Sequence, residues 1–259
     1  MRQVVLLIIT LLLIGCGTKN VNFAALEPSP TSPPPTEAPV TDSIPLAEAN
    51  SVTFHSTTID GTTVEYALVL PASFEEGKGY PVLLALPPGP QTRSMVDAGL
   101  DGYWTQPAQA RGWIVVSPIA PDGQLFFQGS EAVMPEFLRR VAATYPPENG
   151  RFHIAGISNG GLSAFRIALN HPDLFHSVLG IPGFPQTAAD FAKLDQIVDI
   201  PIFLIVGEED TRWLEEMEKT AVAFEEMGGS VTFNIAAGEG HVVRSISGDA
   251  LYDYLDSTR

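Results

Sequence analysis

The sequence has 259 residues, 45% of them hydrophobic, and a formal net charge of −16. This length and apolar content are sufficient for one full domain with a packed core. Because so acidic a chain repels phosphate backbones, nucleic acid is excluded as an expected partner and anionic polymers are disfavoured as substrates.

Residues 1–15 are expected to form a signal peptide. One positive charge in "MRQ" precedes the apolar run "VVLLIITLLLI", which is too short for a comfortable membrane span but suits a signal-peptide core. The run ends in "LIGC", Leu13 to Cys16, which resembles the lipobox of bacterial lipoproteins. This resemblance implies cleavage before Cys16 and lipidation of that residue. An ordinary secretory signal with an incidental cysteine is the alternative. Cys16 is the only cysteine, so no intramolecular disulfide can form.

Residues 16–50 are expected to be a lipid-anchored, proline-rich linker. The stretch "EPSPTSPPPTEAPVTDSIP", Glu27 to Pro45, combines seven prolines with Ser and Thr, so it cannot build a core and should form an extended spacer. A spacer of this kind would hold an anchored domain clear of the bilayer. We therefore expect an extracytoplasmic protein, attached to the cell membrane through Cys16, with its folded domain in residues 51–259.

Residues 51–259 show a regular order of elements. An antiparallel hairpin is expected over residues 51–71, joined at "IDGT". Buried strands are expected over residues 80–87, 113–121, 151–157, 176–183 and 200–207, with a last strand over 230–238. Helices are expected over residues 104–112, 129–146, 159–172, 188–197, 211–228 and 245–259. This alternation predicts an α/β fold: a mostly parallel sheet with helices on both faces and a leading hairpin.

A serine between glycines marks one of the strand-to-helix junctions. In "GISNGG", Ser158 lies between Gly156 and Gly160, where the apolar run of residues 151–157 gives way to a helical pattern. Glycines weaken regular structure, so their presence favours a turn too tight for a Cβ. A serine on such a turn has an exposed hydroxyl, which suits a nucleophile.

Two other strands end in residues that could activate this serine. The strand over 200–207 is followed by "EED", ending in Asp210, and the last strand by "EGH", ending in His241. An imidazole can take the serine proton, and a carboxylate can hold that imidazole in the useful tautomer. Glu208 and Glu209 are alternative acids in the same loop, and Asp210 is favoured because it lies farthest along it.

Four further histidines compete with His241, and only His241 lies in a glycine-rich loop after a late strand. The others are His55, His153, His171 and His176. Several aromatic residues in or near loops could line a substrate pocket, although aromatics more often belong to the core or its rim. These are Tyr103, Trp104, Phe126, Phe127 and Phe184. No Cys or His cluster with metal spacing occurs in the sequence, and we expect no cofactor.

The chain from about Ser51 onward resembles the α/β-hydrolase superfamily. The stretch "GRFHIAGISNGGLSAFRIALNHPDLF" is particularly similar to secreted esterases related to polyhydroxybutyrate depolymerases and feruloyl esterases. The resemblance implies that Ser158 is the nucleophile, that Asp210 of the "VGxxD" loop is the acid and that His241 is the base. It further implies a cofactor-free carboxylic ester hydrolase that forms an acyl-serine on a small or polymeric ester.

The chain departs from this family after the first parallel strand. The family usually has a His-Gly pair there, whose loop supplies a donor to the oxyanion hole, whereas this chain has "LPPGPQTRS", Leu86 to Ser94. Proline has no N–H, so the remaining nearby backbone donors are Gly89 and Gln91. Gln91 is preferred because the turn alone could account for Gly89. The backbone N–H of Asn159 is expected to be the other donor.

The expected function is therefore that of a lipid-anchored, extracytoplasmic serine esterase. A peptidase of the same fold is an alternative, ranked lower because nothing resembles the propeller that restricts access in prolyl oligopeptidases. A surface binding lipoprotein that has lost activity is a second alternative. The intact serine, acid and histidine argue against it.

Overall fold

The computed structural model describes residues 40–41 and 43–259. The predicted signal peptide, the lipidation site Cys16 and most of the predicted linker lie outside the described residues. The described residues belong to one compact unit. The folded domain begins before the expected residue 51, because β1, Val40–Thr41, pairs with the next strand of the sheet and Ile44 is buried in the core. Within the described part of the chain, no helix has the length and apolar character needed to cross a membrane.

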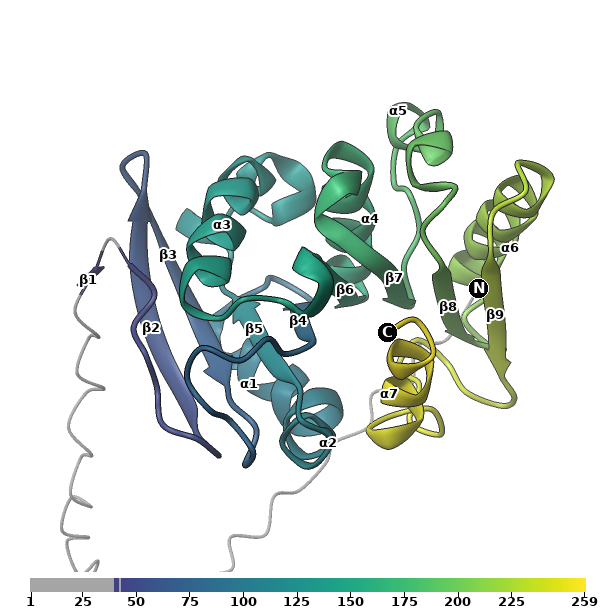
Figure 1. Ribbon diagram of the computed structural model, residues 1–259. Helices are drawn as coiled ribbons and strands as arrows, with labels where there is room; N and C mark the ends of the chain where they lie inside the picture. Colours follow the sequence, from purple (N-terminus) through teal and green to yellow (C-terminus); the bar gives the residue numbers. More distant parts are fainter. Residues whose placement is uncertain (1–39, 42) are drawn as a thin grey trace, which may run out of the picture. The chain divides into compact units, whose positions relative to one another are not determined.

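The unit is built on a nine-stranded sheet with the order β1-β2-β3-β5-β4-β6-β7-β8-β9 (Figure 1). The β2–β3 hairpin and the β3–β5 pair are antiparallel, and all other neighbours are parallel. This arrangement confirms the predicted α/β-hydrolase architecture. The strands are β1 Val40–Thr41, β2 Val52–Ile59, β3 Thr62–Val69, β4 Val82–Leu86, β5 Ile114–Pro118, β6 Phe152–Ile157, β7 Phe175–Ile181, β8 Ile202–Gly207 and β9 Val231–Ala236.

Helices cover both faces of the sheet, because the central strands are apolar on both sides. In β4, Leu84 packs in a cluster with residues of α3, α4 and α6, whereas Leu83 packs in a second cluster with residues of α1, α2 and α7. Figure 1 shows these two groups of helices on opposite sides of the strands. The helices are α1 Arg93–Gly99, α2 Thr105–Arg111, α3 Met134–Thr144, α4 Asn159–Asn170, α5 Ala188–Phe191, α6 Thr211–Glu226 and α7 Asp249–Asp256.

Two helical segments differ from the sequence-based expectation. The helix expected over 104–112 is preceded by α1 and by a π-helical turn, Leu100–Trp104. The helix expected over 188–197 is divided into α5 and a 3₁₀ turn, Leu194–Ile197. In the second case a capping box joins Thr187 and Asp190, and the Asp190 carboxylate also binds the Arg166 guanidinium at 2.8 Å. These contacts fix the start of α5.

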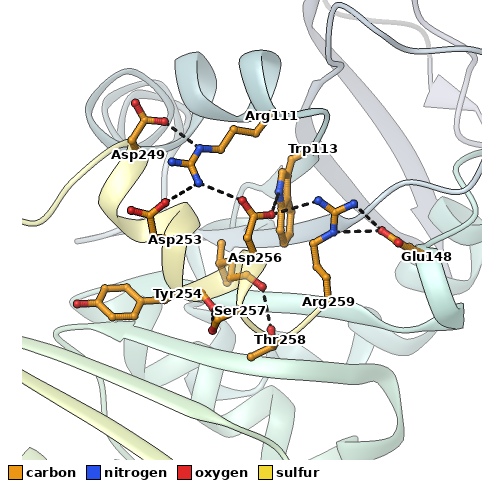
Figure 2. Close-up of polar contacts among 11 residues, drawn as sticks. Arg111, Trp113, Glu148, Asp249, Asp253, Tyr254, Asp256, Ser257, Thr258 and Arg259 are labelled. Carbon is orange, nitrogen blue, oxygen red and sulfur yellow. Dashed lines mark hydrogen bonds and ion pairs between the residues drawn. The ribbon is translucent and has the colours of Figure 1, made fainter.

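The last helix is held by a cluster of charged side chains (Figure 2). Arg111, at the end of α2, forms ion pairs with Asp249, Asp253 and Asp256 of α7 at 3.0, 2.7 and 3.0 Å. The indole Nε1–H of Trp113 also donates to Asp256, at 2.9 Å. Because α7 follows the loop that contains His241, this cluster fixes the C-terminal end of that loop.

Parallel strands bring their carboxyl ends to one edge of the sheet. The last residues of β4 and β6 are near one another in register, with Leu86 opposite Gly156, and Gly207 of β8 lies opposite Ala236 of β9. The chain order also reverses beside β4, which has β5 on one side and β6 on the other. Ligands in open α/β sheets bind at such a reversal, outside the carboxyl ends of the strands.

Candidate active site

Ser158 lies on a strained turn between β6 and α4. Its backbone dihedrals are φ 56° and ψ −118°, in a region that residues other than glycine rarely adopt. The flanking glycines are required by close backbone contacts. A Cβ on Gly156 would collide with the carbonyl of Gly160, and a Cβ on Gly160 would collide with the carbonyl of Leu86. The turn therefore holds the Ser158 hydroxyl above the end of the sheet.

The structure brings together the three residues expected to form a triad. Ser158 Oγ lies 2.7 Å from His241 Nε2, and His241 Nδ1 lies 2.6 Å from Asp210 Oδ2. In the tautomer whose Nδ1–H donates to the Asp210 carboxylate, Nε2 is free to accept from the serine hydroxyl. This is the arrangement in which a histidine acts as a general base towards a serine.

The neighbouring acids have other contacts. Glu208 Oε2 accepts a hydrogen bond from the Gly238 N–H at 2.9 Å, and no hydrogen bond or ion pair joins the exposed Glu209 side chain to His241. Asp210 is less exposed than His241, 13% against 41% of the side chain. Of the three carboxylates in this loop, only Asp210 is within hydrogen-bond distance of the imidazole.

The other histidines lie outside this arrangement. His153 is buried within the sheet, where its Nδ1 lies 2.8 Å from Ser177 Oγ, and burial lowers its pKa to about 3. His55 contacts Thr53 on the β2 strand. Burial also lowers the pKa of His171 and that of His176.

The loop that carries His241 is folded by contacts that the sequence did not indicate. The Glu239 carboxylate accepts hydrogen bonds from the backbone N–H groups of Arg244 and Ser245 at 2.9 and 3.0 Å. The Arg244 bond is the main reason why the pKa of Glu239 is lowered. The Tyr103 hydroxyl donates to the Val243 carbonyl at 3.1 Å. These bonds hold the loop on both sides of His241.

Two backbone N–H groups beside Ser158 have no acceptor among the described residues. One is that of Asn159, the first residue of α4, and the other is that of Gly89 in the loop after β4. The N–H of Gln91, by contrast, donates to the Pro88 carbonyl at 3.1 Å and closes a turn. This contact argues against the sequence-based preference for Gln91 and leaves Gly89 as the candidate donor from this loop.

Gln91 instead has a structural role through its fully buried side chain. Its Nε2 donates to Ser163 Oγ at 3.0 Å, and its Oε1 accepts from the Phe126 N–H at 3.0 Å. The Ser163 hydroxyl in turn donates to the Asn159 carbonyl at 2.9 Å. The network connects the loop after β4 to the first turn of α4.

A second bond connects the same two segments more directly. The side-chain Nδ2 of Asn159 donates to the Gly89 carbonyl at 2.9 Å. Asn159 therefore contributes to this region twice, with a free backbone N–H and with a side chain that holds the loop carrying the Gly89 N–H.

The aromatic candidates separate into core and site residues. Trp104, Phe126 and Phe127 are at most 5% exposed, so they cannot line an open pocket. Phe184 is half-buried and packs edge-on against Trp213, with ring centroids 5.0 Å apart. Trp213, which the sequence did not single out, also lies 5.0 Å from the His241 ring. Among the described residues, no group of three or more His, Cys, Asp or Glu is placed to hold a metal ion.

Comparison with known protein families gives a match over most of the described residues. A model of the esterase family, described as "Putative esterase", matches residues 56–248. No curated protein matches the sequence.

Solved structures share the fold at low identity. A thermostable esterase is 19% identical over 72% of this chain and 54% of its own, with a TM-score of 0.62. A ferulic acid esterase is 20% identical over 80% of this chain and 97% of its own, with a TM-score of 0.59. A "putative dipeptidyl aminopeptidase IV" from Bacteroides ovatus is 17% identical over 80% of this chain and 35% of its own, with a TM-score of 0.61. This chain thus spans about half of the first structure and a third of the last. Since these structures include an esterase and an aminopeptidase, the likeness shows the fold alone.

Proposed function

We propose that this chain, which belongs to the esterase family, is a carboxylic ester hydrolase that works through an acyl-enzyme on Ser158. The observation that supports this mechanism is the continuous chain of short contacts from Ser158 Oγ through the His241 ring to Asp210. The strained backbone of Ser158 is a second support, because it lifts the nucleophile into the site.

In the first half of the reaction, His241 Nε2 takes the proton of the Ser158 hydroxyl as Oγ attacks the ester carbonyl carbon. The carbonyl electron pair moves onto its oxygen, which the N–H groups of Asn159 and Gly89 are placed to stabilise. When this tetrahedral species collapses, the alcohol leaves and takes the proton from His241. The acyl group remains on Ser158.

In the second half, water takes the place of the alcohol. His241 removes a proton from the water as its oxygen attacks the acyl carbon, and the same N–H groups stabilise the negative oxygen again. Collapse then releases the acid, and Ser158 recovers its proton from His241. The net change is ester plus water to acid plus alcohol.

The predicted lipid anchor completes the proposal. The "LIGC" motif and the proline-rich stretch support attachment of the catalytic domain to the outer side of a membrane through Cys16. Stable retention needs more than one acyl chain, because a single chain binds membranes only marginally. Mass spectrometry of the native protein should find a mature chain that begins at a lipidated Cys16. An unmodified soluble form that begins elsewhere would contradict this part of the proposal.

A fluorophosphonate probe tests the nucleophile. The probe should label the wild type on the peptide that contains Ser158, and Ser158→Ala should abolish both labelling and hydrolysis of 4-nitrophenyl acetate. Ser257→Ala, which changes an exposed serine beyond α7, should leave both unchanged. Labelling that persists in Ser158→Ala, or a well-folded wild type that is neither labelled nor active, would contradict the proposal.

A further inference from the structure

A pocket opens beside the proposed triad, next to helix α6. It has a volume of about 310 Å³ and is lined by Leu162, Phe184, Gln186, Arg212, Trp213 and Glu216, which we call the α6 pocket. Leu162 is one turn beyond Ser158, and its N–H donates to the Ser158 carbonyl at 3.1 Å. Because the Trp213 ring also packs against His241, a group in this pocket is adjacent to the reacting atoms.

The inner wall of the α6 pocket is aromatic. The rings of Phe184 and Trp213 meet at 72° with both side chains half-buried, so part of each ring faces the pocket. Aromatic rings pack well against other flat apolar groups. The volume lies at the small end of the usual range for ligand pockets, which suits a single ring.

The open side of the pocket carries hydrogen-bond donors without partners. The side chains of Arg212 and Gln186 are exposed, and neither forms a hydrogen bond or ion pair with any described residue. Glu216, the acid in the lining, is paired with Lys219 at 2.8 Å, which offsets its charge. A guanidinium presents donors in a planar fork that matches a carboxylate.

We propose that the α6 pocket binds an aromatic carboxylate on one side of the substrate ester, with the ring against Phe184 and Trp213 and the carboxylate on Arg212. The inference rests on the proposed ester hydrolysis at Ser158. It narrows the substrate class to esters in which either the acid or the alcohol part is aromatic and carries a free carboxylate. The monoester of an aromatic dicarboxylic acid is one example. Both carboxylate oxygens accept donors from Arg212, and Gln186 is available as a further donor.

Matched pairs of esters test the carboxylate. On the acyl side, monomethyl terephthalate is compared with methyl 4-carbamoylbenzoate; on the alcohol side, 4-carboxyphenyl acetate is compared with 4-carbamoylphenyl acetate. Each pair differs only by a charged carboxylate and its neutral amide counterpart. In one of the two pairs, the wild type should show a kcat/KM about tenfold higher for the carboxylate, the size expected of a charge-assisted hydrogen bond at an exposed site.

Variants assign that preference to Arg212. Arg212→Gln should remove this preference by raising KM for the carboxylate ester towards the value for the amide ester, and Arg212→Lys should retain only part of the preference. Arg151→Gln makes the same change of charge at the opposite end of β6 and should leave the preference intact. Thermal unfolding of each variant shows whether the fold is preserved.

Phenyl acetate separates this inference from the proposed function. If the wild type hydrolyses phenyl acetate but prefers neither carboxylate, or if Arg212→Gln keeps the preference, the α6 pocket inference is overturned and ester hydrolysis stands. If folded wild type hydrolyses none of these esters, both are overturned.

Discussion

Asn159→Ala should lower kcat without unfolding the protein. The variant keeps the backbone N–H of residue 159 and removes only the side-chain bond to the Gly89 carbonyl, which is 2.9 Å long. Gly89 has a φ of 55°, and its carbonyl and N–H share one Cα, so a bond to the carbonyl restrains the direction of the N–H. Asn159 is partly buried, and a single hydrogen bond contributes about 0.5–1.5 kcal/mol.

The size of the effect follows from this figure. If the loop aligns the Gly89 N–H only while the bond holds it, about 1 kcal/mol corresponds to a roughly fivefold loss of the aligned population and of kcat. Complete loss of one oxyanion donor, about a hundred- to a thousandfold, is the upper limit. Asn159→Asp should approach this limit, because it replaces the donor with a negative charge facing a carbonyl.

Steady-state hydrolysis of 4-nitrophenyl acetate measures kcat and KM for each variant. Asn170→Ala is the matched control, since it removes a partly buried asparagine from the opposite end of α4, where its side chain accepts a hydrogen bond from Lys193 at 2.7 Å. The control should keep kcat, and Asn159→Ala should change kcat rather than KM. Normal kcat in both Asn159 variants would refute the reasoning that this side chain positions an oxyanion donor.

Three other predictions concern the triad, the buried His153 and the tight turn at Gly160. Ser158→Ala and His241→Ala should each reduce turnover of 4-nitrophenyl acetate by several orders of magnitude, and Asp210→Asn by somewhat less; a nearly silent Asp210→Asn would show that another group orients the imidazole. Burial lowers the pKa of His153 from 6.5 to about 3, so between these pH values the unfolded chain binds a proton that the folded chain does not. The free energy of unfolding is therefore retained above pH 6.5 and falls by about 1.4 kcal/mol for each pH unit below it. Urea unfolding at pH 7 and pH 5 measures this loss, which should be smaller in His153→Gln, and an equal loss in the variant would contradict it. Gly160→Ala should yield little folded protein on expression, since its Cβ would meet the backbone of Leu86, and a stable, active variant would exclude the tight turn.

The sheet and the positions of the triad residues could be read from the sequence because local patterns specify them. Continuous apolar runs predict buried parallel strands, and parallel strands necessarily bring Ser158, Asp210 and His241 to one edge. The loop contacts had no such local signal. The buried Gln91 side chain is satisfied by the Phe126 N–H and by Ser163, which are distant in sequence, so its role depends on tertiary packing. For the same reason the helical pattern after Asp210 could not show that Trp213 faces the histidine.

The packing of Trp213 against His241 gives the protein an internal optical probe. The chain has three tryptophans, and the other two, Trp104 and Trp113, are at most 1% exposed within a closed cluster of side chains. Their emission should therefore stay nearly constant while the indole of Trp213 senses the charge of the neighbouring imidazole and the entry of a ligand. Since a protonated imidazole quenches indole, each passage of a proton through His241 should dim this one fluorophore. Stopped-flow fluorescence of the unlabelled enzyme could thus follow formation and breakdown of the acyl-enzyme with any ester, coloured or not.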